Sequence, residues 1–134
     1  MKHFNFLFLF IGVLGIMVAC TGSDSGETMN NCDLTGPEIQ HMVIFNLPYP
    51  EGSEEAGRFL DDGARILTSI PVVQHFQAFR QVSAKNDYQY GFSMVFANQE
   101  DYNTYNNHPD HQAFVQERWN REVTGFLEID LKKR

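Results

Sequence analysis

The chain has 134 residues and a formal net charge of −7, with 10 lysines and arginines against 17 aspartates and glutamates. An acidic chain without a basic stripe argues against nucleic acid as a partner. Its length is enough for one small domain with a modest core, and no repeat suggests a solenoid.

The chain opens with the pattern of an export signal. Lys2 precedes an apolar run at residues 4–18, and the run ends at Ala19 and Cys20. A charged start, a short apolar run and a small residue at its end are typical of a secretory signal, and a bilayer span would need roughly 20 apolar residues. A cysteine in this place resembles the lipobox of bacterial lipoproteins. We predict a signal peptide at residues 1–19 and lipid on Cys20; an ordinary secretory signal is the alternative.

The segment after the signal is polar. Residues 21–31 hold no apolar side chain except Met29, and such a composition cannot offset the entropy lost on ordering. We therefore predict a flexible tether at residues 20–39 and one folded domain at residues 40–134. Cys32 remains as a lone cysteine, which excludes an internal disulfide or a zinc site.

These features place the predicted protein in the cell envelope, outside the cytoplasm. Two or three acyl chains on Cys20 would give a durable membrane anchor, at about 0.8 kcal/mol per buried methylene. Thr21 follows the cysteine, and it is not the aspartate that retains some lipoproteins at the inner membrane. An outer-membrane anchor is therefore favoured in a cell with two membranes.

The folded domain has the predicted element order β-α-β-β-α-β. Apolar alternation predicts the strands, helical spacing and capping residues predict the helices, and prolines end several elements. In chain order, the predicted elements are a strand at 41–47, a helix from Ser53 to Ile70, strands at 72–82 and 88–97, helical segments after Asn98 and at Pro109, and a strand at 124–131.

Two strands have clearly distinct faces. The strand at 88–97 has a bulky face with Tyr90, Phe92, Met94 and Phe96, and a face of smaller residues. In the strand at 124–131, we expect the apolar residues to point inward and the acidic ones outward; these are Leu127, Ile129 and Leu131, and Glu128 and Asp130.

Two β-α-β units in tandem predict a ferredoxin-like α+β sandwich. Its helices would cover one face of the sheet and leave the other face bare and apolar. Bare patches of this kind rarely stay monomeric, so we predict a homodimer whose two sheets pair and enclose a dimeric α/β barrel.

The residues also resemble a known family, the stress-responsive A/B barrel (Dabb) domain, over residues 41–133. The resemblance implies a dimeric α+β barrel but no single activity. The residues that carry it are His41-x-Val43-x-Phe45-x-Leu47, Ile70-Pro71, Tyr88-x-x-Gly91-Phe92-Ser93-Met94-Val95-Phe96, Tyr105-x-x-His108-Pro109-x-His111, Phe114-Val115 and Trp119.

One group in this family, the plant polyketide cyclases, closes linear poly-β-ketones by aldol condensation without a cofactor. The resemblance implies a histidine base at His111, a tyrosine partner at Tyr105 and a cavity histidine at His41. A base with a pKa near 7 suits proton abstraction beside a carbonyl. The same resemblance implies that the ligand pocket includes Tyr88, Tyr90, Phe92 and His108.

Two departures from the cyclases change the implied pocket. Gly63 stands where the cyclases have a pocket tyrosine, and Tyr90 stands where they have a histidine, so the plant substrate is not implied. Each candidate also has a structural alternative. His111 can pack on an apolar stripe, His108 can cap a helix, and Tyr105 can belong to the core.

Three functions are compatible with the sequence. The first is a module that binds a small apolar or aromatic molecule in the barrel. The second is a cofactor-independent cyclase or lyase with His111 as base and Tyr105 as its partner. The third is a structural or stress-protective oligomer without a ligand. We predict no metal, because Pro109 makes His108 and His111 a poor chelating pair. We also predict no cofactor, because export would remove the protein from the nucleotide cofactors of the cytoplasm.

Overall fold

The computed structural model describes Leu34 and residues 36–134. The predicted signal peptide, the lipid site Cys20 and the cysteine at position 32 lie outside the described residues. Within the described part, no helix is both long and apolar enough to cross a membrane.

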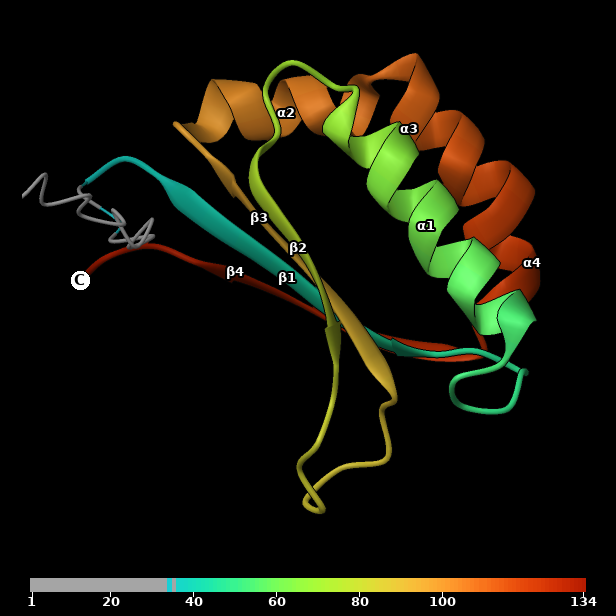
Figure 1. The fold of residues 1–134 in the computed structure, drawn as a ribbon. Coiled ribbons are helices and arrows are strands. Elements are labelled where there is room, and N and C mark those ends of the chain that lie inside the picture. Colours follow the sequence, from blue (N-terminus) through green and yellow to red (C-terminus); the bar gives the residue numbers. More distant parts are fainter. Residues whose placement is uncertain (1–33, 35) are drawn as a thin grey trace, which may run out of the picture. The chain divides into compact units, whose positions relative to one another are not determined.

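The described chain alternates strands and helices in the predicted order (Figure 1). The first strand begins at Ile39, two residues before the predicted start. The elements are β1 (Ile39–Asn46), α1 (Glu54–Thr68), β2 (Gln74–Arg80), β3 (Tyr90–Phe96), α2 (Gln99–Asn107), α3 (Pro109–Phe114), a π-helical turn η1 (Val115–Trp119), α4 (Asn120–Glu122) and β4 (Gly125–Leu131).

The four strands form one sheet in the order β2-β3-β1-β4, and every neighbouring pair is antiparallel. The helices lie together on one side of this sheet (Figure 1). We call the other side the open face. This arrangement confirms the predicted ferredoxin-like α+β fold.

Helix α1 follows from its local sequence. The Ser53 side chain accepts a hydrogen bond from the backbone N–H of Ala56, and acidic residues occupy the first turn, where the helix dipole favours them. Its buried stripe includes Phe59, whose ring lies 5.7 Å from that of Phe45 on β1. The ring of Trp119 lies 5.0 Å from Phe45 as well, so one aromatic cluster joins the helices to the sheet.

Strand β3 is buried along its whole length. Its bulky residues belong to the core against the helices, as the sequence pattern predicts; they are Tyr90, Phe92, Met94 and Phe96. The smaller residues Gly91, Ser93 and Val95 alternate with them and therefore lie on the open face.

The predicted orientation of the last strand is wrong. Asp130 is paired with His41, and Glu128 with Val43, so both carboxylates lie on the helix-covered face with these β1 residues. The apolar residues Leu127, Ile129 and Leu131 lie on the open face and remain 39–47% exposed. Alternation shows which residues share a face, but it does not show which face meets the helices.

The predicted helix that begins at Pro109 is present but interrupted. It continues from α3 through the π-helical turn to α4, so an extra residue enters the helical register. Within the turn, Arg118 forms ion pairs with Asp62 and Glu122, and its guanidinium lies 5.5 Å from the ring centroid of Phe59. These contacts tie the turn to α1.

Candidate functional site

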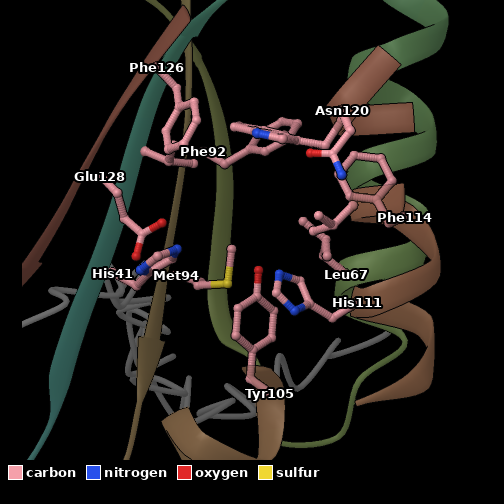
Figure 2. Close-up of a pocket in the computed structure, with 13 residues that line it drawn as sticks. His41, Leu67, Phe92, Met94, Tyr105, His111, Phe114, Asn120, Phe126 and Glu128 are labelled. Carbon is pink, nitrogen blue, oxygen red and sulfur yellow. The ribbon is translucent and has the colours of Figure 1, made fainter. Parts of the chain in front are cut away.

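A cavity of about 210 Å³ lies between the sheet and the helices. Most of its lining is apolar and comes from β1, β3, α1 and the segment from α3 to Trp119. Figure 2 shows that His41, Tyr105, His111 and Glu128 lie toward one end of this lining, and that Asn120 lies apart from them, beside Phe114.

His41 is held by a carboxylate. It lies on the central strand β1, is 5% exposed, and its Nδ1 lies 2.7 Å from Oδ1 of Asp130. The two residues are direct partners in the β1–β4 register. When Nδ1 donates to this carboxylate, Nε2 becomes the ring nitrogen that can accept a proton.

Tyr102 on α2 fixes the same carboxylate from the other side. Its hydroxyl donates to Oδ2 of Asp130 at 2.8 Å, and it lies 3.4 Å from Oε1 of Glu128. Burial raises the pKa of Tyr102 to about 12, and the hydrogen bond to Asp130 contributes to this shift. The hydroxyl therefore stays protonated at neutral pH and remains a donor.

Tyr105 and His111 meet across the joint between α2 and α3. The side chain of His108 caps α3 by accepting from the N–H of Asp110, and Pro109 opens the helix. The rings of Tyr105 and His111 then lie with their centroids 4.1 Å apart at 33°. Both rings border the cavity (Figure 2).

Burial sets the protonation of this ring pair. It raises the pKa of the Tyr105 hydroxyl well above its usual value, and it lowers the pKa of His111 below 6.5. At neutral pH, Tyr105 is therefore a hydrogen-bond donor and His111 is uncharged. The Nδ1 atom of His111 is buried and has no hydrogen-bond partner among the described residues.

The lowered pKa of His111 predicts how stability depends on pH. The unfolded chain binds a proton at this ring more readily than the folded chain, so the contribution is fully present above the unfolded pKa of 6.5 and is lost as the pH falls below it. When the pH is lowered from about 7.5 to about 5.5, we expect the free energy of unfolding to fall less in His111→Gln than in the wild type. Urea unfolding at both pH values measures this difference.

The matched control is His75→Gln, since His75 is exposed on β2. This variant should follow the wild-type dependence on pH. Equal losses in the wild type and in His111→Gln would contradict the role of burial at His111.

Four other residues were predicted to line the pocket, and only one of them does so. Phe92 lines the cavity, whereas Tyr88, Tyr90 and His108 are not among its lining residues. Tyr90 is buried beside Phe45, and its hydroxyl accepts a hydrogen bond from the N–H of Gly52 at 3.1 Å. It therefore holds the loop before α1, and His108 acts as a helix cap.

Two acidic residues of the site were not predicted. Glu128 lines the cavity and Asp130 holds His41, although both were expected to point outward. Their sequence signal was the i, i+2 spacing on one strand face. Nothing local connects Asp130 with His41, because 89 residues separate them and only the strand register brings them together.

The same corner contains a group that could ligate a metal ion. Ligand atoms of His41, Glu128 and Asp130 all lie within 4.8 Å of one another. A histidine with two carboxylates suits a divalent cation such as zinc or manganese. Asp130 already accepts hydrogen bonds from His41 and Tyr102, however, so its carboxylate is satisfied by protein donors.

The arrangement brings together the groups that acid–base chemistry uses. A neutral imidazole can take a proton, and a protonated phenol can polarise a carbonyl by hydrogen bonding. The apolar walls exclude water from part of the cavity and strengthen both interactions.

Comparison with known proteins agrees with this architecture. The family model described as the stress responsive A/B barrel domain, Dabb, matches residues 39–133. A Dabb family protein with a ferredoxin-like fold from Mesorhizobium loti is 50% identical; the alignment covers 75% of this chain and 99% of that chain, with a TM-score of 0.72. No match was found among curated proteins.

Two more distant structures share the fold alone. A dimeric protein of unknown function from Bacteroides fragilis is 16% identical, with 75% of this chain and 99% of that chain covered and a TM-score of 0.58. The hydroxynitrile lyase from Passiflora edulis is 8% identical, with 75% and 96% covered and a TM-score of 0.65. With the family model matched over the whole described sheet and its helices, the chain belongs to the stress-responsive A/B barrel (Dabb) family.

Proposed function

We propose that this protein is a membrane-tethered homodimer that binds a small, mostly apolar molecule in the cavity between its helices and its sheet. One observation carries the binding proposal. Polar side chains from β1, β4, α2 and α3 converge on a cavity whose other walls are apolar, and this combination is typical of small-molecule sites. A cavity of about 210 Å³ is smaller than those that hold drug-sized ligands.

The open face supports the dimer. It carries an apolar patch that none of the described helices covers; we call Met42, Ile44, Phe79, Leu127, Ile129 and Leu131 the open-face patch. Contiguous apolar surface of this kind marks an interaction site. The solved relative from Bacteroides fragilis is described as dimeric, and a second copy of this chain is the occupant we propose.

The membrane tether rests on the sequence pattern at Cys20. The expected result is that the wild type incorporates a labelled fatty acid in bacterial cells and that Cys20→Ser does not. Cys32→Ser is the matched control and should label like the wild type. Labelling of Cys20→Ser would contradict the lipid anchor.

Binding can be tested with phenol as a one-ring probe. We expect phenol to shift the side-chain NMR signals of Tyr105 and His111. Val115 lines the cavity, so Val115→Phe should fill part of it and abolish the shifts. Val82→Phe makes the same change at a residue that is 89% exposed and should keep them. Unchanged signals in the wild type, or equal shifts in both variants, would contradict the proposal.

A second candidate function is proton transfer beside a carbonyl, in the manner of a cofactor-independent cyclase or lyase. The observation that favours it is the short His41–Asp130 hydrogen bond beside the Tyr105–His111 ring pair. A carboxylate that orients a histidine leaves its other nitrogen available as a base.

This candidate predicts a simple exchange reaction. The protein should accelerate exchange of the methyl protons of acetophenone in heavy water, and His111→Gln and His41→Gln should slow it. His75→Gln provides the control. Exchange no faster than in buffer would remove this candidate but would leave binding untouched.

A further inference from the structure

We infer that the cavity selects uncharged or cationic molecules that have one ring and a hydrogen-bond donor, and that it rejects carboxylates and fused rings. This inference rests on the proposed binding function and names the class of ligand. Three features of the cavity carry it: its volume, its wall at Phe92 and Gly63, and the charge of its lining.

The volume limits the ligand to a single ring. An apolar protein cavity of about 150 Å³ accommodates benzene. The cavity here has about 210 Å³, which leaves room for one ring and a few substituent atoms. A fused two-ring molecule would have to displace part of the wall or leave its second ring outside the cavity.

The Phe92 ring has no room to move away from the cavity. A Cβ atom placed on Gly63 would lie 2.8 Å from Cζ and 2.9 Å from Cε2 of Phe92, so the ring edge already touches the α1 backbone. The Phe92 ring also lies 5.0 Å from Phe45 and 5.3 Å from Phe76. Closely packed rings on these sides prevent the wall from yielding to a longer ligand.

The lack of a side chain at Gly63 is what gives Phe92 this position. The same added Cβ would also lie 3.3 Å from Cζ of Phe114. Phe92 and Phe114 both border the cavity, so a methyl group at position 63 would push them toward its empty space. Gly63 therefore sets the size of the cavity although it does not line it.

The charge of the lining excludes anions. Of the described residues that line the cavity, none is a lysine or an arginine, and Glu128 is a carboxylate. Asp130 adds a second carboxylate beside His41. An anionic ligand would enter a partly apolar space next to like charges, which costs both desolvation and repulsion.

The polar lining also calls for a donor on the ligand. Glu128 offers acceptor oxygens and the uncharged ring of His111 borders the cavity, while Tyr105 offers a hydroxyl that can donate. A ligand hydroxyl both donates and accepts, and an ammonium group donates to the carboxylate. Phenols and benzylamines fit this pattern, whereas benzoate does not.

Calorimetric titration of the purified full-length protein with phenol, benzylamine, benzoate and 1-naphthol tests the inference. We expect phenol and benzylamine to bind at least about tenfold more tightly than benzoate and 1-naphthol. Glu128→Gln should bind benzoate more tightly than the wild type, and Glu117→Gln, at an exposed position outside the cavity, should not. Gly63→Ala should weaken phenol binding, and Gly57→Ala on the same helix should leave it unchanged, since an added Cβ there meets nothing within 4 Å.

The outcomes separate this inference from the function on which it rests. Equal affinities for all four probes would show a binding cavity without the proposed selectivity and would overturn the inference alone. Equal phenol affinity in Gly63→Ala and Gly57→Ala would show that Gly63 and Phe92 do not set the size of the cavity. Absence of binding by every probe would overturn both the inference and the proposed function.

Discussion

Replacing Ile129 by lysine is expected to convert the proposed homodimer into a monomer. Ile129 lies within the open-face patch, directly opposite Met42 in the β1–β4 register. When two patches pair, an ammonium at this position would be buried without a partner. Each uncompensated buried charge costs about 3–5 kcal/mol, and the dimer would contain two of them, one per subunit, so the dissociation constant should rise by roughly 10⁴–10⁷-fold.

Sedimentation velocity at micromolar concentration measures this change. The wild type should sediment as a dimer and Ile129→Lys as a monomer with an unchanged circular dichroism spectrum. Thr68→Lys adds the same charge at an exposed position of α1 and should remain dimeric. A wild type that is monomeric at this concentration would contradict the dimer proposal, and so would an Ile129→Lys variant that remains dimeric.

The same glycine-to-alanine change should have opposite effects at two positions of α1. Alanine stabilises a helix interior by about 0.5–1 kcal/mol relative to glycine, so Gly57→Ala should be more stable than the wild type. At Gly63 this gain is offset because the new methyl group would clash with the Phe92 ring. Overpacking of a core costs about 1–3 kcal/mol, and the difference between the two variants isolates that cost.

Urea unfolding of both variants provides the measurement. Gly57→Ala should have a higher midpoint than the wild type, and Gly63→Ala should lie below Gly57→Ala by the overpacking cost. Equal stabilities of the two variants would mean that the Phe92 ring moves freely, and the rigid wall proposed for the cavity would then be wrong.

Most of the fold follows from local patterns in the sequence. The Ser53 and Asn98 caps, the prolines after β1 and the helical spacing of α1 each act over a few residues, so each element could be predicted where it occurs. The tandem β-α-β order then leaves few topologies. The π-helical turn was not predicted from local patterns, and its Arg118 pairs with Asp62 on another helix, a contact that such patterns do not reveal.

The site was predictable only in part. Tyr105 and His111 belong to one short motif, and the structure places both at the cavity. The His41–Asp130 hydrogen bond depends on a strand register that joins distant parts of the chain. The outward expectation for Glu128 and Asp130 failed because the open face is itself apolar, so hydrophobicity does not identify the helix-covered side of β4.

The alternating faces of strand β4 restrict which deletions the chain can tolerate before this strand. Its odd-numbered apolar residues lie in the open-face patch, and its even-numbered carboxylates lie beside His41. A deletion of one residue between α4 and Ile129 would rotate every later side chain to the opposite face, whereas a deletion of two would restore the alternation. Such a single deletion would place carboxylates between the subunits of the proposed dimer and leave His41 without its partner. The number of residues between α4 and Ile129 can therefore change by an even number, but an odd-numbered change would exchange the two faces of β4.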